Sequence, residues 1–506
     1  MNAQNKVVNI VNFIRGCEPR DASVDLLGTV KEEIKLNKEF GFDNTFLIQY
    51  NALINPEYSS LLISEKDDKT EIGCWLEMCE QLSTDAGIAW RGKYEWDWRV
   101  NPGFLPAYTQ TERERIIDTY FKKFKEVFGE YPKSVGCWLI DSYSMEYMSK
   151  NYDIDAFCIC REQYGTDGYT LWGGYYNGAY YPSKKNMILP AKTAEYTIDV
   201  PCFRMLGIDP ADGYGDGHQK QHSICKGGCP TLEPVWEMGY TEKWIESYFK
   251  NFCNNEDLGY SYTQTGQENS FDWVNFASGL RKQFKVIARL QKEGRLVVKK
   301  LGDSGVDFKK QFATTPATVY STLDYAGDDG CKSIWYSGKN YRANLFLSNG
   351  SIRFRDIQLF DETFEEYHYS EPETDKDTFY FSYPVIDGRV WGNGSGIFFD
   401  KKGDITDVSE LNGALKMDIA FMDKKTATLI MSENGIEISS DSDFALAYVY
   451  NDAKQLQEFG GDTVKYLQDG NAYELNVTEG DLITKTDKPM INSANGKITL
   501  KFKVVK

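Results

Sequence analysis

The sequence predicts an α/β domain followed by an all-β domain, namely a seven-stranded (β/α)7 barrel over residues 1–300 and a β-sandwich over residues 301–506. A length of 506 residues exceeds one ordinary core and suits two or three. Before about residue 300, short apolar runs alternate with amphipathic helical stretches, which is typical of parallel βαβ units. Beyond it, the helical period gives way to short alternating runs between Gly, Asn and Asp turns, which indicates antiparallel sheets.

The barrel strands are predicted at seven short runs rich in β-branched, aromatic or cysteine residues. Amphipathic helices are expected between them, including Asp25–Phe40, with Asp25 as a cap, and Thr111–Phe128, whose TERE opening fits a capping pattern. We expect the segment Gly302–Pro316 to be the hinge between the domains, with part of it free to pack on the barrel. The predicted strands are Val7–Ile14, Thr45–Tyr50, Glu71–Leu76, Ser134–Ile140, Ala156–Cys160, Val200–Leu206 and Gly259–Gln264.

Composition limits the partners and the compartment. Lys and Arg total 57 against 75 Asp and Glu, and the resulting charge of −18 disfavours nucleic acid and anionic membranes. The first residues lack a secretory-signal pattern and no window reaches 18 apolar residues, so we expect a cytoplasmic protein. The 11 cysteines lie in apolar runs, which predicts buried, reduced thiols rather than disulfides. No cofactor is predicted, and the oligomeric state stays open.

Ionisable and amide residues gather after the predicted strands, where the functional groups of a β/α barrel are expected. For each residue taken alone, a structural ion pair at the barrel rim is the alternative interpretation. The residues predicted to bind substrate are Arg15, Glu18, Asp21, Tyr50, Glu77, Arg161, Glu162, Arg204, Glu233, Gln264, Gln267 and Asn269.

Two long segments concentrate aromatic residues among Gly, Asn and Asp. The first is YEWDWRVN at residues 94–101, which includes Trp96, and the second covers residues 164–183 and includes Trp172. Flat apolar faces beside hydrogen-bonding groups are what a sugar requires, although aromatic residues also fill cores and interfaces. Because long ordered loops in compact domains usually carry function, we predict a carbohydrate ligand for both segments.

Several motifs resemble an uncharacterised family of glycoside hydrolase/deacetylase-like proteins, known as domains of unknown function 3863 and 3864. The resemblance covers most of the chain. It implies a (β/α)7 barrel related to polysaccharide deacetylases and to the retaining hydrolases of glycoside hydrolase families 38 and 57. The motifs are EIGCW from Glu71, PKSVGCWLID from Pro132, GTDGYTLWGGYYNGAYYPS from Gly165, TQTGQENSF from Thr263 and RANLFLSNGSIRFRDIQLFDE from Arg342.

The third predicted strand departs from the deacetylase pattern. Where those enzymes carry two metal-binding histidines, this chain has Trp75 and Cys79. Because Trp does not ligate metal, a zinc-activated water is not expected and no catalytic metal is predicted. A second group has the residue types of a structural zinc site, in tighter spacing than usual, and a polar loop with incidental cysteines is the alternative. It consists of His218, His222, Cys225 and Cys229.

The fourth predicted strand supports hydrolase chemistry. Its WLID ending resembles the family 38 pattern, which implies that Asp141 is the nucleophile, and the family 57 acid position falls on Glu268. Glu233, Glu77 and Asp21 are rivals, and an ion pair of Asp141 with Arg15 or Arg161 is the structural alternative. The predicted function is a metal-independent, retaining glycoside hydrolase acting on an oligosaccharide or glycoside. A non-catalytic carbohydrate-binding protein and a metal-dependent deacetylase using Glu77 with Asp21 are the alternatives.

Overall fold

The structure is a computed structural model of the chain. It describes residues 6–176, 178–205, 232–256, 258–324, 330–388, 394–450, 456–484 and 488–505. The four residues of the predicted zinc group, between 218 and 229, lie outside the described ranges.

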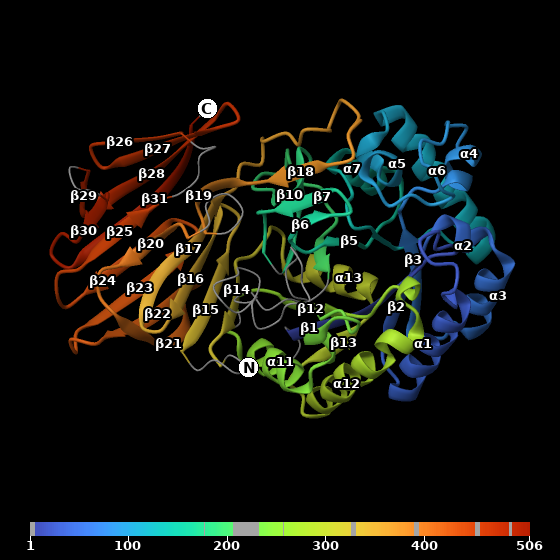
Figure 1. The fold of residues 1–506 in the computed structure, drawn as a ribbon, viewed down its shortest axis with the longest axis horizontal. Helices are drawn as coiled ribbons and strands as arrows, with labels where there is room; N and C mark the ends of the chain where they lie inside the picture. The colour runs from blue at the N-terminus through green and yellow to red at the C-terminus, as the bar shows by residue number, and fades with distance from the viewer. Residues whose placement is uncertain are drawn as a thin grey trace.

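The first part of the chain forms a mixed α/β domain around a nearly closed, barrel-like sheet (Figure 1). All seven predicted strands are present as parallel neighbours in the order β12-β1-β2-β3-β4-β5-β11. They are β1 (Lys6–Ile14), β2 (Asn44–Ile48), β3 (Thr70–Trp75), β4 (Ser134–Gly136), β5 (Ala156–Cys160), β11 (Cys202–Met205) and β12 (Ser261–Thr265).

The predicted count of seven strands is not reproduced, because the sheet has nine. β8 (Ala179–Tyr180) pairs antiparallel with β11, and β13 (Val297–Lys299) pairs parallel with β1. Both strands are too short to show a hydrophobic period, which explains why pattern analysis missed them.

Helices surround this sheet (Figure 1). Asp25 caps α1 by accepting the Gly28 N–H at 2.8 Å, as predicted. The capping box of α6 differs from the prediction, because it uses Thr109 with Glu112 rather than Thr111. The helices are α1 (Leu26–Phe40), α2 (Tyr50–Ile54), α3 (Pro56–Glu65), α4 (Glu80–Asp85), α5 (Val100–Gly103), α6 (Gln110–Phe128), α7 (Ser142–Asn151), α10 (Glu237–Tyr240), α11 (Glu242–Asn254), α12 (Trp273–Lys292) and α13 (Leu301–Gln311).

Helix α13 occupies most of the segment predicted to be a hinge, and it packs on the barrel-like sheet. The Leu301 N–H donates to Thr45 Oγ1 at 2.9 Å, and the Gly302 N–H donates to Glu71 Oε2 at 3.0 Å. Asn9 Nδ2 on β1 donates to Ser304 Oγ at 2.8 Å. The amino-terminal half of the helix is therefore fixed to the first domain, and the division at residue 300 stays a prediction.

Two antiparallel sheets follow and share one hydrophobic core. One has the order β14-β15-β16-β17-β20-β25-β30-β29, with β19 paired to β17, and the other the order β21-β22-β23-β24-β31-β28-β27-β26. The first contains β14 (Thr318–Thr322), β15 (Cys331–Ser337), β16 (Tyr341–Ser348), β17 (Ser351–Leu359), β19 (Tyr383–Asp387), β20 (Gly396–Phe399), β25 (Ala445–Val449), β29 (Asp481–Ile483) and β30 (Met490–Asn492). The second contains β21 (Gly403–Leu411), β22 (Ala414–Phe421), β23 (Thr426–Ser432), β24 (Gly435–Ser440), β26 (Leu456–Gly460), β27 (Thr463–Gln468), β28 (Asn471–Glu479) and β31 (Lys497–Val505).

A small mixed sheet joins the two halves of the chain. β18 (Thr378–Phe381) pairs parallel with β7 (Tyr169–Trp172), which forms a hairpin with β6 (Gln163–Thr166). The segment between β5 and β11 is thus anchored by residues more than 200 positions later. β9 (Pro182–Ser183) and β10 (Asn186–Pro190) form a further two-stranded sheet in this segment.

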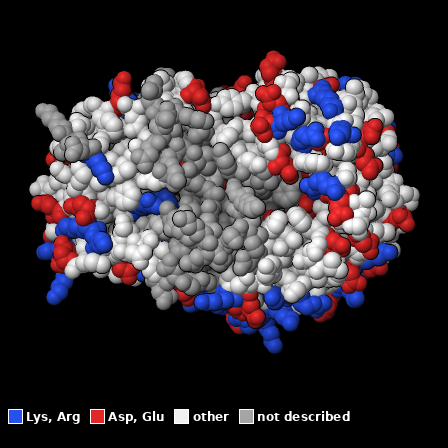
Figure 2. All heavy atoms as spheres, in the orientation of Figure 1, with Lys and Arg blue, Asp and Glu red and all other residues white. Residues whose placement is uncertain are grey.

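The nine described cysteines are buried and free, which confirms the predicted reduced thiols for that part of the chain. None of the helices in the described ranges is long and apolar enough to cross a membrane. Lys and Arg side chains are interspersed with Asp and Glu on the face shown in Figure 2.

Candidate functional site

Arg15 is the centre of an ionic cluster at the carboxyl ends of the barrel strands. Its Nε and Nη2 donate to the two carboxylate oxygens of Glu77 at 2.9 and 2.7 Å. Its Nη1 lies 2.6 Å from Glu268 Oε2 and donates to Ser270 Oγ at 3.1 Å. All three charged side chains are buried, so the two carboxylates depend on this guanidinium for compensation.

Neighbouring strands hold this cluster in place. Arg15 follows β1 directly, and its backbone N–H and carbonyl both bind the side-chain amide of Asn269, at 2.9 Å each. Gln49, at the end of β2, donates to Glu77 at 3.1 Å. Gly266 has a φ of 124°, and a Cβ there would lie 1.9 Å from the Val11 carbonyl oxygen, so only glycine lets the chain pass β1 before Glu268.

Aromatic rings and guanidinium groups alternate outward from Arg15. The Arg15 guanidinium lies 4.1 Å from the Trp96 ring centroid, and that of Arg20 lies 4.8 Å from Trp96 and 5.3 Å from Trp98. Trp98 stacks on Tyr94 with centroids 5.6 Å apart, and both rings are half-exposed. Glu18 fixes Arg20 through its Nε at 2.7 Å. The predicted aromatic segment 94–101 therefore lies beside the ionic cluster, with part of its surface open to solvent.

Glu233 is a second buried carboxyl group beside Glu268. Gln267 Nε2 donates to Glu233 Oε1 at 3.3 Å, and Gln283 of α12 holds the flanking segment through the carbonyls of Leu232 and Gly239 at 2.6 Å each. Burial raises the pKa of Glu233 to about 7, and the Glu268 charge adds to this effect while Arg161 opposes it. This carboxyl group can therefore hold a proton at neutral pH.

The pKa of Glu268 is also raised, mainly by burial and further by the charge of Glu77. Arg15 and a hydrogen bond from Ser270 Oγ at 2.8 Å act in the opposite direction and favour the carboxylate. Two buried, electrostatically coupled carboxyl groups with different immediate partners are an arrangement suited to acid and base roles.

Asp141 lies in a separate cluster. It is fully buried and caps α7, accepting the Ser144 N–H at Oδ1 and the Ser144 hydroxyl at Oδ2, at 2.9 and 2.7 Å. Its ion pair, at 2.9 Å, is with Arg113 of α6 and not with Arg15 or Arg161 as the structural alternative predicted. Glu366 lies nearby, and burial followed by the Asp141 charge raises its pKa to about 8.

Four other predicted residues bind partners outside the Arg15–Glu77–Glu268 cluster. The Tyr50 hydroxyl donates to Asp85 at 2.7 Å. Asp21 is exposed and accepts two hydrogen bonds from Ser23 in its own turn. Gln264 lies in β12 and accepts from the Tyr262 hydroxyl at 3.2 Å, and Arg204 lies in β11 and donates to the Cys160 carbonyl at 2.7 Å.

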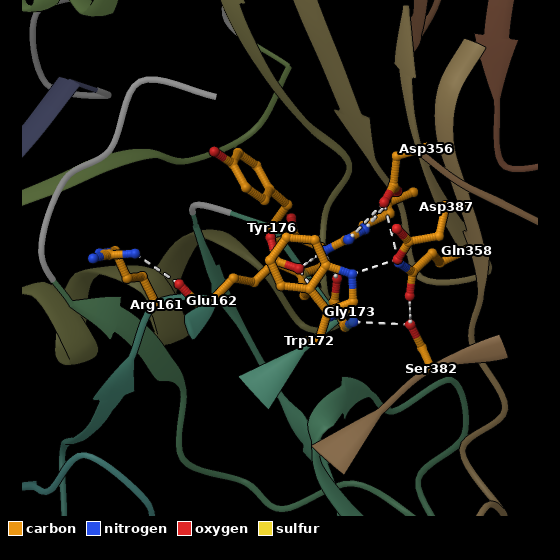
Figure 3. A network of polar contacts seen from close by, with 12 residues as sticks. Arg161, Glu162, Trp172, Gly173, Tyr176, Asp356, Gln358, Ser382 and Asp387 are labelled. Atoms are coloured by element: carbon orange, nitrogen blue, oxygen red, sulfur yellow. Dashed lines mark hydrogen bonds and ion pairs between the residues drawn. The ribbon is translucent and has the colours of Figure 1, made fainter. Parts of the chain in front are cut away.

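In the predicted aromatic segment 164–183, every tyrosine and tryptophan whose side chain the structure describes is buried, so none of these rings offers a free sugar-binding face. Trp172 is completely buried, and its indole N–H donates to Asp387 on β19 (Figure 3). Tyr176 is buried and stacks on Trp335 of β15 with centroids 4.2 Å apart. These rings fill the interface between the segment and the first antiparallel sheet. Glu162, predicted to bind substrate, belongs to this interface too, because it pairs with Arg342.

Three residues that complete these clusters were not predicted from the sequence. Arg113 lies in the middle of a helix, where no strand-end rule applies, and Glu366 lies far from Asp141 in the chain. Asp167, in the β6–β7 turn, interacts electrostatically with Arg20 and Arg15, which places this turn near the ionic cluster. Of the three, only Asp167 had a signal in the sequence, because it lies in a glycine-rich turn of the aromatic segment 164–183.

No protein-family model and no curated protein matches the chain. Among solved structures, the crystal structure of "a putative glycoside hydrolase/deacetylase" from Parabacteroides distasonis has a TM-score of 0.56 and 14% sequence identity, covering 78% of this chain and 94% of that one. A "putative polysaccharide deacetylase" from Mycobacterium smegmatis and a "probable polysaccharide deacetylase" from Pseudomonas aeruginosa each have a TM-score of 0.37, at 12% and 10% identity, covering 61% of this chain and 92% of theirs. At these identities, the first comparison shows a shared fold.

Proposed function

We propose that this chain is a metal-independent, retaining glycoside hydrolase acting on an oligosaccharide or glycoside, with its site in a (β/α)7-type barrel over residues 1–300. The observation that carries the proposal is the coupled pair of buried carboxyl groups, Glu233 and Glu268, beside the Arg15 cluster. The half-exposed rings of Tyr94 and Trp98 next to that cluster support a sugar ligand. The description of the Parabacteroides protein as a glycoside hydrolase/deacetylase is consistent with this class.

The two carboxyl groups receive different roles in this proposal. Glu233, with a pKa of about 7, donates a proton to the glycosidic oxygen as the bond to the anomeric carbon breaks. Glu268, whose carboxylate is favoured by Arg15, attacks the anomeric carbon and forms a glycosyl ester. Glu233 then removes a proton from water, the resulting hydroxide equivalent displaces the ester, and both side chains return to their initial states.

The contacts of Asp141 support a different role from the nucleophile predicted for it. Both of its carboxylate oxygens accept hydrogen bonds from Ser144, and Arg113 pairs with one of them. Such contacts are those of a helix cap within a buried ion pair. We therefore assign the nucleophile to Glu268 and the acid to Glu233, one of the rival carboxyl groups predicted from the sequence.

The deacetylase alternative requires a metal site. Glu77, expected to serve with Asp21, has both carboxylate oxygens bound to Arg15, and the residues at the two histidine positions of the deacetylase pattern do not fit a metal either. Trp75 is buried between Phe13, at 4.2 Å between centroids, and Trp138, at 5.2 Å. Burial raises the pKa of the Cys79 thiol to about 12, which disfavours the thiolate that a metal needs. No group of three or more His, Cys, Asp or Glu residues suited to a metal occurs in the described part of the chain.

A panel of aryl glycosides, assayed with and without chelator, tests the proposal. We expect turnover that survives chelation, and an anomeric product that retains its configuration by NMR. Glu268→Ala should abolish turnover, and added azide should restore product as a glycosyl azide of opposite configuration. Glu233→Gln should slow substrates with poor leaving groups far more than activated ones.

Glu366→Gln is the matched control, because Glu366 is also buried with a raised pKa but belongs to the Asp141 cluster. It should keep most of the activity. Turnover that is lost in chelator and returns with a divalent ion would overturn the proposal. Sugar binding without any turnover would instead favour a non-catalytic carbohydrate-binding protein.

A further inference from the structure

Arg342, on β16 of the first antiparallel sheet, is the centre of a buried polar network (Figure 3). Its Nε and Nη2 pair with the two oxygens of Asp356 on β17, both at 2.9 Å. Its Nη1 pairs with Glu162 Oε1 at 2.5 Å. All three side chains are buried, so both carboxylates depend on the Arg342 guanidinium for charge compensation. This ion-pair network joins the barrel domain to the sheet domain.

Glu162 is the member of this network that the barrel provides. Besides pairing with Arg342, its carboxylate accepts the Gly173 N–H at 2.8 Å. Further hydrogen bonds extend the network across the interface, so the position of Glu162 is fixed from both sides. They are Trp172 Nε1 to Asp387, Gln358 Nε2 to Asp356 and to Asp387, and Ser382 Oγ to Gln358.

Arg161 directly precedes Glu162, and its side chain points away from the Arg342 network. Figure 3 shows it on the opposite side of Glu162 from Asp356, with its Nη1 donating to the Glu162 carbonyl oxygen at 2.7 Å. The groups that act on the pKa of Glu233 include the charges of Arg161 and Glu268 and hydrogen bonds from Gln267 and Trp236. Of these four, Arg161 is the cation, and its charge lowers that pKa. The segment that Arg342 fixes therefore carries a positive charge that acts on Glu233.

We propose that Arg342 is a positioning residue for the barrel site: by holding Glu162, it fixes the turn after β5 so that Arg161 faces Glu233. This inference rests on the proposed role of Glu233 as the acid. It gives a residue of the carboxyl-terminal part of the chain an indirect role at the barrel site, exerted through Glu162.

The test compares pH profiles of kcat for the full chain and for Arg342→Gln. Losing the fixed turn lets Arg161 move away from Glu233, so the carboxyl group should keep its proton to higher pH. We expect the alkaline limb to move upward by about one unit, with the same direction of shift in Arg161→Met. Arg342→Lys should show a smaller upward shift than Arg342→Gln, because lysine keeps the positive charge but not the two-pronged contact with Asp356.

Difference infrared titration, with and without Glu233→Gln, measures the pKa of the Glu233 carboxyl group without turnover, both in the wild type and in Arg342→Gln. This measurement separates the two proposals. If Arg342→Gln raises the pKa of Glu233 but Glu233→Gln leaves the alkaline limb of kcat in place, Glu233 is not the acid, and the positioning role of Arg342 is still supported. If Arg342→Gln does not fold, Glu162→Gln provides the same test, since it keeps the shape and removes the ion pair.

Arg355→Gln is the matched control. Arg355 is buried on the neighbouring strand β17 and donates to Asn344 at 2.9 Å. It should leave the Glu233 titration unchanged. An unchanged Glu233 titration in folded Arg342→Gln or Glu162→Gln, or an equal shift in Arg355→Gln, would overturn the positioning role.

Discussion

Arg15 and Glu77 form a two-pronged ion pair across the ends of β1 and β3, with N–O distances of 2.9 and 2.7 Å and almost no exposure of either side chain. The same guanidinium lies 2.6 Å from Glu268. One cation thus compensates two buried carboxylates. This relationship makes the barrel mouth sensitive to a change at a single residue.

Arg15→Met should destabilise the fold, because it leaves Glu77 and Glu268 buried without their cation. Removing one partner of a buried pair costs about 3–5 kcal/mol, and protonation of one carboxyl group will offset part of this. Guanidinium denaturation followed by circular dichroism measures the loss. Arg281→Gln, which removes an exposed pair with Glu39, is the control and should leave the midpoint nearly unchanged.

The stability of the protein should fall as pH rises through the titration range of Glu233. Burial raises its pKa from 4.5 to about 7, so the folded state binds a proton that the unfolded state has released. The contribution of Glu233 to the free energy of unfolding is therefore complete below about pH 4.5, and about 3 kcal/mol of it is lost by pH 8. Urea denaturation from pH 4.5 to 8 should show a flatter dependence for Glu233→Gln. An equal slope in both proteins would contradict the assignment.

Asp141→Ala should reduce stability strongly while leaving the activity of each folded molecule largely intact. The change removes the cap of α7 and leaves Arg113 buried without its carboxylate, at a cost of about 3–5 kcal/mol. Thermal denaturation and activity per folded molecule are the measurements. Asp141→Asn keeps the shape, so complete loss of turnover in a stable Asp141→Asn protein would instead identify Asp141 as the nucleophile.

Trp98→Ala should raise KM for oligosaccharide substrates about tenfold with a smaller change in kcat, because a stacking surface is lost while the carboxyl groups stay in place. Initial-rate kinetics on substrates of increasing length provide the measurement. Tyr367→Ala, which changes a half-exposed ring elsewhere on the chain, should leave KM unchanged. A drop in kcat alone would indicate a disturbed site rather than a lost binding surface.

The sequence was sufficient to locate the barrel strands because each is a short, buried run rich in β-branched, aromatic or cysteine residues. It could not locate β8 and β13, which are two and three residues long, nor the pairing of β18 with β7, which depends on tertiary contact alone. The convergence of Arg15, Glu77 and Glu268 followed from the rule that parallel strands end at one edge.

The role of Asp141 illustrates what remained hidden. A carboxylate after a barrel strand has the same sequence position whether it faces a substrate or caps the next helix. The decision depends on Ser144, three residues later, and on Arg113 reaching it from another helix. Trp172 is similar, because an aromatic residue in a glycine-rich segment does not reveal which surface will cover it.

The pairing of β7 with β18 has a consequence for synthesis on the ribosome. Tyr169 aligns with Thr378, so the β6–β7 hairpin waits for its partner strand until more than 200 further residues have been added. At translation speeds of about 5–20 residues per second, that interval is on the order of 10–40 s. During it, Trp172 and the Glu162 carboxylate lack the later partners Asp387 and Arg342 that cover them in the folded chain, so this surface of the nascent barrel is one that a chaperone could protect.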